Sequence, residues 1–131
     1  MPAAAVLLTP ELDLTESGDS FQTIHTLDLM LSGTLMNANL LYAAGHDLAH
    51  PYLSPLFGDF SKGFPPTFLQ AGTRDLFLSN TVRMHRALRR AGVPVELHIF
   101  EAMPHAGFGG APEDVELAGE TRRFVAEHWA V

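Results

Sequence analysis

Residues 65–76 decide the fold, and they read Pro-Pro-Thr-Phe-Leu-Gln-Ala-Gly-Thr-Arg-Asp-Leu. Residues 67–71, Thr-Phe-Leu-Gln-Ala, predict a short strand that ends at Gly72. Asp75 follows a few residues later. A titratable side chain in this place would lie just beyond the carboxyl end of the strand, where open parallel sheets form their binding and catalytic sites.

Two further strands are expected, one before and one after this stretch. Residues 95–100 alternate between apolar and polar side chains, as a strand with one face more buried does. Residues 3–8 form a short apolar run closed by Thr9 and Pro10, which indicates a buried strand.

Helices are expected after the second and third of these strands. One begins at Ser79 or Asn80, either of which could cap it, and ends before Gly92. The last begins at about Pro112 and has acidic residues in its first turn. Strands that alternate with helices imply a parallel sheet with right-handed crossovers. The sequence therefore predicts an α/β fold of about three parallel strands with flanking helices.

The remaining segments are less regular. Residues 11–25 are polar and predict a loop, whereas residues 26–44 carry Leu and Met at helical spacings and predict two short helices split at Gly33. Residues 45–66 contain seven glycines and prolines, which predicts a long loop. Long loops inside a compact domain are usually functional. We expect a single domain over residues 1–131.

Composition places the chain among ordinary globular proteins. Its 131 residues are 47% hydrophobic, and 8 basic against 15 acidic residues give a net charge of −7. Nucleic acid is not expected as a partner, because its phosphates need a basic face. No run approaches the ~20 apolar residues of a membrane helix. The absence of cysteine excludes disulfides and thiolate sites. No basic residue precedes the apolar start, so we expect no signal peptide. We expect a cytoplasmic location.

Two titratable residues follow neighbouring strands of the expected sheet. Asp75 follows the strand at 67–71, and His105 follows the strand at 95–100. Adjacent parallel strands would place both residues at the same edge of the sheet. A carboxylate beside an imidazole fixes the tautomer of the ring and stabilises its charged form, as in the orienting half of a nucleophile–His–Asp triad. The alternative is that Asp75 caps a turn and His105 is an ordinary loop histidine.

A nucleophile for such a triad is not apparent in the chain. The nearest match to the G-x-S-x-G elbow is residues 18–22, around Ser20, but its second glycine is missing and no strand runs into Gly18. Ser20 is better interpreted as a loop serine or a helix cap. The glycine-rich loop that forms an oxyanion hole is also absent.

Other ligand motifs are weak. Residues 107–110 resemble a phosphate-binding loop but lack the preceding strand, the spacing and the lysine. His46 and His50 are four apart, but Gly45 and Pro51 flank them and disfavour a helix. We therefore expect no metal site and no cofactor.

The order of several motifs resembles a known family. Residues 65–76 are similar to the acid-residue region of α/β-hydrolases, most of all in the hormone-sensitive-lipase and acetyl-esterase branch. Residues 103–108, Met-Pro-His-Ala-Gly-Phe, resemble the catalytic histidine motif of that branch. The similarity also includes residues 8–15, 52–56, 88–93 and 95–97.

The resemblance implies a serine carboxylesterase or lipase that hydrolyses small carboxylic esters. Asp75 would be the triad acid and His105 the general base. The similarity begins at about the sixth of the family's eight strands, so it implies that this chain corresponds to the C-terminal half of the fold. The nucleophile elbow and the oxyanion loop would lie outside it, and the isolated chain is expected to be inactive.

Two other functions remain open from the sequence. The chain could be a non-catalytic module of this fold that acts in dimerisation or binding. It could also belong to a peptidase of the prolyl-oligopeptidase type, which shares the order of Asp and His, although residues 103–108 favour the esterase branch. A homodimer is expected in either of two forms. It would use the exposed edge of the strand at 3–8 or the apolar face of residues 27–42.

Overall fold

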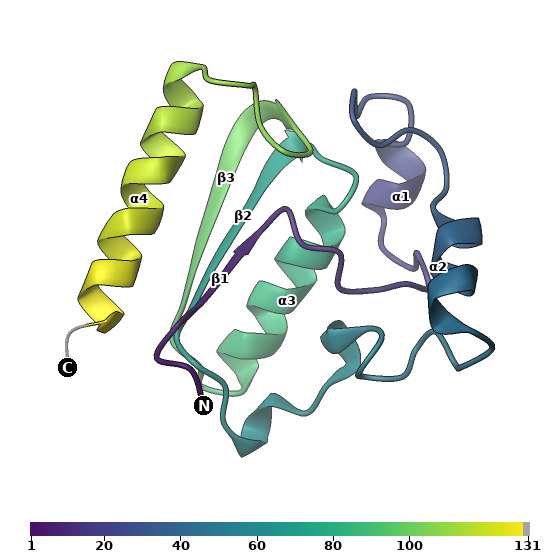
Figure 1. Ribbon diagram of the computed structural model, residues 1–131, viewed down its shortest axis with the longest axis horizontal. Helices are drawn as coiled ribbons and strands as arrows, with labels where there is room; N and C mark the ends of the chain where they lie inside the picture. Colours follow the sequence, from purple (N-terminus) through teal and green to yellow (C-terminus); the bar gives the residue numbers. More distant parts are fainter. Residues whose placement is uncertain (130–131) are drawn as a thin grey trace.

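The computed structural model describes residues 1–129. Within them lies a three-stranded parallel sheet in the order β1-β2-β3, formed by β1 (Ala5–Leu8), β2 (Thr67–Arg74) and β3 (Val95–Pro104). Leu69 of β2 pairs with Leu7 on one side and Leu97 on the other. The carboxyl ends of the strands point the same way, toward the top of Figure 1. The predicted α/β fold is confirmed.

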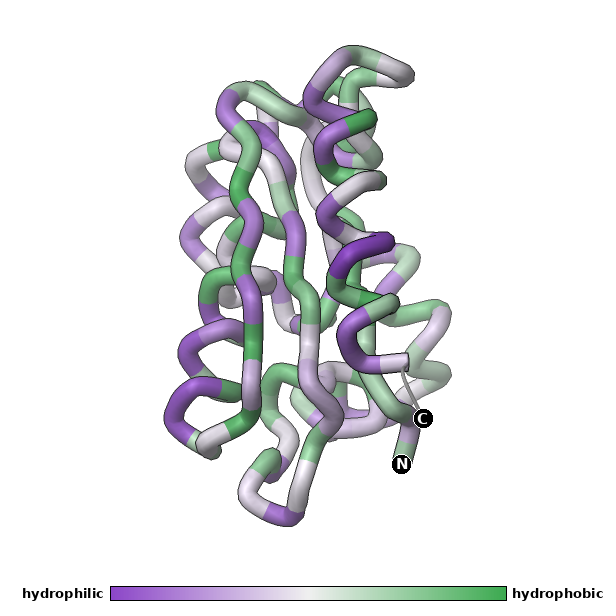
Figure 2. The backbone as a smooth tube through the Cα atoms, turned by 90° about the vertical axis from the view of Figure 1, so that its left-hand side faces the viewer, coloured by the Kyte–Doolittle hydropathy of each residue, from purple (hydrophilic) through white to green (hydrophobic). Residues whose placement is uncertain are grey.

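One long helix covers each face of the sheet (Figure 1). These helices are α3 (Leu78–Arg90) and α4 (Pro112–Trp129). Side chains alternate between the two faces, so Leu69 packs toward α3 whereas Phe68 meets Phe124 of α4 with ring centroids 5.6 Å apart. Figure 2, viewed from the side of α4, shows the alternation of hydrophobic and hydrophilic residues along β3. Successive side chains of a strand point to opposite faces of the sheet, so hydropathy alternates along a strand whose two faces have different surroundings.

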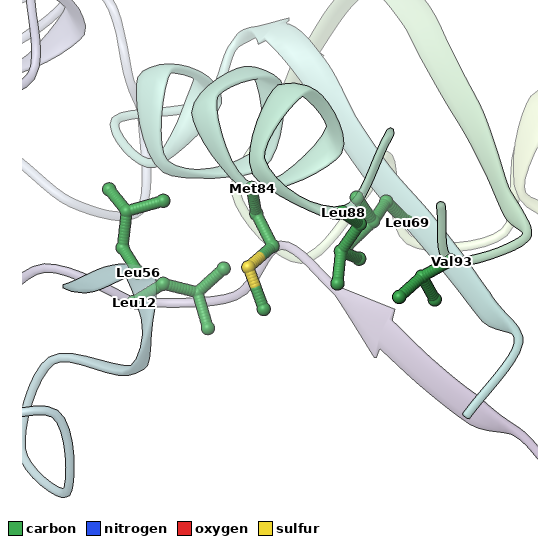
Figure 3. Close-up of a cluster of buried hydrophobic side chains, with 6 residues drawn as sticks. All are labelled: Leu12, Leu56, Leu69, Met84, Leu88 and Val93. Atoms are coloured by element: carbon green, nitrogen blue, oxygen red, sulfur yellow. The ribbon is translucent and has the colours of Figure 1, made fainter. Parts of the chain in front are cut away.

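The core beneath α3 joins segments that lie between Leu7 and Leu97 in the sequence. Met84 and Leu88 of α3 are at most 1% exposed and pack on Leu69. Burying side chains of this kind contributes about 1.5–3 kcal/mol each. Figure 3 shows the cluster, which consists of Leu12, Leu56, Leu69, Met84, Leu88 and Val93.

The strand around residues 67–71 does not end at Gly72, as the sequence suggests, but continues to Arg74. The pairing of β2 with β3 shifts register between Gly72 and Arg74. At Gly72 the two strands approach so closely that a Cβ atom would lie 1.9 Å from the carbonyl oxygen of Met103. Gly72 therefore permits a close approach of two backbones and does not break the strand.

The N-terminal half differs from expectation in its helices. The predicted loop at 11–25 contains α1 (Ser20–Thr23), and the two helices predicted within 26–44 reduce to α2 (Met36–Ala43). Residues 26–35 are not helical because the Asp28 carboxylate accepts the backbone N–H groups of Met30 and Leu31. A side chain that binds nearby backbone groups in this way competes with a helix.

Two smaller features concern the loop at 45–66 and the start of α3. The long loop at 45–66 contains two short 3₁₀ turns, η1 (Pro55–Phe57) and η2 (Phe60–Lys62). Helix α3 begins at Leu78 without a side-chain cap, so Ser79 and Asn80 lie inside it and the expected cap at these residues is wrong. Among residues 1–129, no helix has the length and apolar character needed to cross a membrane.

We predict opposite effects for alanine at two glycines. Gly72→Ala should lower the free energy of unfolding by about 2 kcal/mol or more, because the backbone of β3 must move to admit the methyl group. Gly119→Ala is the control, because its Cβ would meet nothing within 4 Å on α4, and it should raise stability by about 0.5–1 kcal/mol. Urea denaturation of both variants measures this, and an unchanged midpoint for Gly72→Ala would contradict it.

Candidate active site

Asp75 lies in a tight turn between β2 and α3. The backbone N–H of Asp75 donates to the carbonyl of Gly72 at 3.1 Å, and the carbonyl of Asp75 accepts from the N–H of Leu78 at 3.0 Å. The side chain is fully buried, and its Oδ1 accepts from the N–H of Phe77 at 3.0 Å. The turn thus holds the carboxylate at the carboxyl end of the central strand.

The structure places His105 next to Asp75. Its Nδ1 lies 3.2 Å from Oδ1 of Asp75, and the imidazole is 23% exposed. The ring also packs edge-on against Phe77, with centroids 5.2 Å apart. With Nδ1–H donating to the carboxylate, the Nε2 lone pair of the neutral ring is left available for a proton.

Burial dominates the electrostatics of this pair. It raises the pKa of Asp75 above the ordinary Asp value, against the opposing effects of the Phe77 N–H and of His105. Oδ2 of Asp75 is buried and has no hydrogen-bond partner in the part of the chain that the structure describes. His105 is thus the one charged or polar side chain that hydrogen-bonds this carboxylate among residues 1–129. Perturbed carboxyl groups in such places are typical of functional sites.

Asp114, in the first turn of α4, holds the loop that follows His105. Its carboxylate accepts the backbone N–H groups of Phe108, Gly110 and Ala111, at 3.0, 2.6 and 2.9 Å. These bonds, that of Phe108 foremost, lower the pKa of Asp114. Gly107 has a φ of 89°, and a Cβ there would lie 2.5 Å from Oδ1 of Asp114. The backbone N–H groups of this glycine-rich loop are therefore engaged by Asp114.

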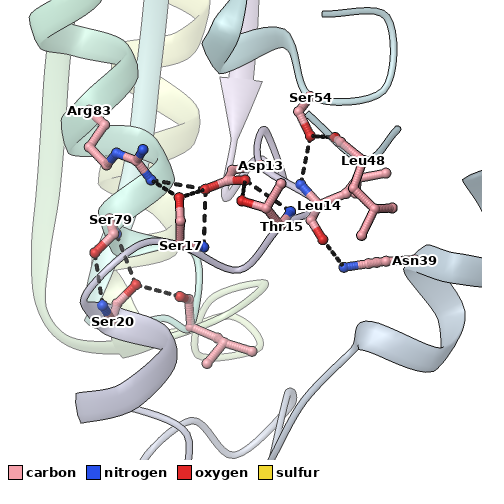
Figure 4. A network of polar contacts seen from close by, with 11 residues as sticks. Asp13, Leu14, Thr15, Ser17, Ser20, Asn39, Leu48, Ser54, Ser79 and Arg83 are labelled. Carbon is pink, nitrogen blue, oxygen red and sulfur yellow. Dashed lines mark hydrogen bonds and ion pairs between the residues drawn. The ribbon is translucent and has the colours of Figure 1, made fainter. Parts of the chain in front are cut away.

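Ser20 is the first residue of α1, so it is neither a loop serine nor the cap of that helix, and its side chain bridges α1 and α3. Its hydroxyl donates to the carbonyl of Leu76 at 2.6 Å and accepts from the N–H of Ser79 at 3.0 Å. The Ser79 hydroxyl in turn accepts from the N–H of Ser20 at 2.8 Å. Figure 4 shows this reciprocal pair, which joins α1 to the start of α3. The Ser20 hydroxyl is thus engaged in two hydrogen bonds.

A second buried carboxylate, that of Asp13, lies outside the pair of Asp75 and His105. Asp13 accepts from the backbone N–H of Thr15 at 2.9 Å and from the Ser17 hydroxyl at 2.6 Å (Figure 4). It also forms an ion pair with Arg83 of α3 at 2.9 Å. These contacts tie the segment after β1 to α3.

Sequence reasoning missed two contributors to the geometry. The hydroxyl of Thr73 accepts the N–H of Ala102 at 2.7 Å and so joins the ends of β2 and β3. The second is Asp114, which the sequence indicates only as an acidic residue in the first turn of the last helix. Its position at the third residue of α4, after a run rich in glycine, is the signal that could have indicated a loop-holding carboxylate. Among residues 1–129 no group of three or more metal-ligating side chains could hold a metal ion.

Comparisons with known proteins show the family of the chain. Residues 1–109 match the sequence profile of a family described as the alpha/beta hydrolase fold. The chain is 33% identical over 106 residues to an acetyl-hydrolase of Streptomyces hygroscopicus, covering 80% of this chain and 35% of that protein. Among solved structures, an esterase called E25 superposes with a TM-score of 0.90 at 42% identity, over 98% of this chain and 41% of that chain. An esterase from the bacterial hormone-sensitive lipase (HSL) family gives a TM-score of 0.92 at 29% identity, over 99% of this chain and 45% of that one.

The chain therefore belongs to the α/β-hydrolase fold family. Within it, the chain belongs to the branch of the hormone-sensitive lipases and acetyl-esterases, as the resemblance in the sequence predicts. It spans about a third of the length of the curated relatives it matches.

We predict that Asp75→Asn stabilises the protein at neutral pH. Because the pKa of Asp75 is raised on folding, the stability linked to this group is complete in acid, below the ordinary Asp pKa, and falls as pH rises through the folded pKa. Asparagine removes that loss, so the melting temperature at pH 7 should rise by a few degrees, equivalent to about 1 kcal/mol. The gain should shrink as the pH is lowered toward 4.

Calorimetry over that pH range measures the effect. The control is Asp59→Asn, at an exposed carboxylate that caps η2, and it should give no such rise. A lower melting temperature for Asp75→Asn at pH 7 would show that the charged carboxylate stabilises the fold on balance.

Proposed function

We propose that this chain supplies the acid and the base of a serine carboxylesterase. The observation that carries the proposal is the 3.2 Å contact between Nδ1 of His105 and the buried carboxylate of Asp75, at the carboxyl ends of adjacent parallel strands. An imidazole held in this way is suited to remove a proton from a hydroxyl through Nε2. The family that the chain belongs to gives the same roles to an Asp and a His in this order.

The proposed reaction is acyl transfer through a serine. His105 takes the proton of the serine hydroxyl as its oxygen attacks the ester carbonyl, and later gives that proton to the leaving alcohol. Asp75 holds the ring and stabilises its charged form. The 131-residue sequence has no G-x-S-x-G elbow, and Ser20 is engaged elsewhere, so the attacking serine comes from outside this chain.

Small carboxylic esters are the proposed substrates. The relatives carry the names acetyl-hydrolase and esterase, which supports esters with short acyl groups as the class to test first. A cytoplasmic location stays a prediction of the sequence.

A chimeric enzyme tests the proposal. This chain would replace the segment of the Streptomyces hygroscopicus acetyl-hydrolase to which it is similar, so that the host supplies the serine elbow. We expect the chimera to hydrolyse p-nitrophenyl acetate, and His105→Ala to lower kcat by about 10⁴-fold or more. The 131-residue chain alone should show no saturable turnover that a serine-reactive phosphonate abolishes.

His85→Ala is the matched control, because His85 lies on α3 and makes no hydrogen bond to Asp75. It should leave kcat within about twofold of the unsubstituted chimera. An active chimera in which His105→Ala and His85→Ala behave alike would refute the proposed role of His105.

We also propose that the chain forms a homodimer, through one of two surfaces. On β1, the N–H of Ala5 donates to Pro66 and that of Thr9 to Gln70, so by alternation the N–H groups of Val6 and Leu8 point away from β2. Edge groups of this kind can pair with another strand. The second surface is the face at 27–42, where the most exposed large apolar side chains are Leu29 (87%), Leu41 (83%) and Tyr42 (72%).

Two substitutions distinguish these surfaces. Val6→Pro removes a donor from the free edge and should give a monomer if the strands pair. Leu41→Asp places a charge on the other face and should give a monomer if that face is buried. Light scattering coupled to size exclusion measures the mass of each variant. A monomeric wild-type chain at tens of micromolar would eliminate both forms.

A further inference from the structure

Asp28 is a buried carboxylate outside the pair already described. Its residue is 3% exposed, although it lies in an irregular segment between α1 and α2 in which the flanking Leu27 and Leu29 are exposed. A buried acidic side chain in an apolar stretch needs hydrogen-bond donors to offset the loss of water. All of the donors that reach Asp28 are backbone N–H groups.

Two of these donors belong to the loops that carry Asp75 and His105. Oδ2 of Asp28 accepts the N–H of Leu76, the residue directly after Asp75, at 2.8 Å. Oδ1 accepts the N–H of His105 itself at 3.4 Å, which is a long bond. One carboxylate thus contacts the backbone beside the acid and the backbone of the base, which are 48 and 77 residues away in the sequence.

Contacts within its own segment also fix the position of Asp28. Oδ1 also accepts the N–H groups of Met30 and Leu31, at 2.9 and 3.3 Å, and the N–H of Asp28 donates to the carbonyl of Ile24 at 3.1 Å. The segment is further held by apolar packing of Leu31 and Leu35 on the buried cluster of Phe21, Leu76 and Phe77. Asp28 is therefore a rigid point against which both loops are placed.

From these contacts we infer that Asp28 is a positioning residue, which sets the separation of Asp75 and His105 by holding the backbone beside each of them. The inference rests on the proposed function, in which that separation is needed for proton transfer. The charge of Asp28 also acts on Asp75, since it is one of the lesser causes that raise the pKa of Asp75. Asparagine at position 28 keeps the shape of the side chain but has one oxygen in place of two, so it cannot hold both loops.

Nuclear magnetic resonance of the ¹⁵N-labelled 131-residue chain tests the inference without an activity assay. The readout is the downfield Nδ1–H proton of His105, which is visible when it is bonded to a carboxylate and shielded from exchange. In Asp28→Asn we expect exchange of this proton with water to rise by about tenfold or more, until the signal broadens or disappears.

Asp13→Asn is the matched control, because Asp13 is also fully buried and also accepts backbone N–H groups, those of Thr15 and Ser17. It should lower the melting temperature but leave the His105 signal unchanged. A signal that persists in Asp28→Asn overturns the inference. Loss of the signal in both variants also overturns it, because the effect is then one of general stability.

A further measurement covers the case in which Asp28→Asn does not fold. In the wild-type chain, the Leu76 amide should exchange with solvent as slowly as the amides of β2, and rapid exchange would overturn the inference.

The failure of the proposed function is a separate result. If the wild-type chain shows no bonded Nδ1–H on His105, the acid–base pair itself is contradicted, whereas a wild-type signal that Asp28→Asn does not alter contradicts the role of Asp28 alone.

Discussion

The close approach of β2 and β3 at their carboxyl ends is the constraint on which the site depends. At Gly72 only a hydrogen atom fits on the α-carbon, because a Cβ would lie 1.9 Å from the carbonyl oxygen of Met103. The register of the pairing between β2 and β3 shifts directly after this point, between Gly72 and Arg74. Asp75 and His105 follow immediately, and their side chains meet at 3.2 Å. The catalytic geometry that we propose therefore depends first on how the two strands pack and only then on the two side chains.

Carboxylates organise the irregular segments around this pair. Asp28 and Asp114 each accept several backbone N–H groups, Asp28 beside the turn after β2 and Asp114 from the first turn of α4. Glu16 acts similarly on the segment that precedes α2, where it accepts the N–H of Leu35 at 2.6 Å. Backbone donors without a partner would be costly in these partly buried loops. Part of the net charge of −7 therefore has a structural purpose.

The sequence predicts those parts of the structure that local patterns determine. The three strands, α3 and α4 follow from hydrophobic periodicity and from glycine and proline at their ends. The pairing of Asp75 with His105 follows from the rule that parallel strands bring their carboxyl ends to one edge. What the sequence could not predict depends on distant partners. The extension of β2 past Gly72 needs Met103 of β3. The role of Asp28 needs contacts with backbone groups 48 and 77 residues away. The lack of a helix at 26–35 has a local cause instead, because the Asp28 carboxylate accepts the N–H groups of Met30 and Leu31, and the helical spacing of Leu and Met does not reveal this competition.

We propose that the buried carboxylate of Asp75 holds His105 with Nδ1 protonated and Nε2 free to accept a proton. Long-range ¹H–¹⁵N correlation of the His105 ring, at a pH where the imidazole is neutral, measures the tautomer directly. We expect a single tautomer in which Nδ1 carries the proton and Nε2 shows the shift of an unprotonated nitrogen. A ring protonated at Nε2, or one that averages between the two tautomers, would contradict it.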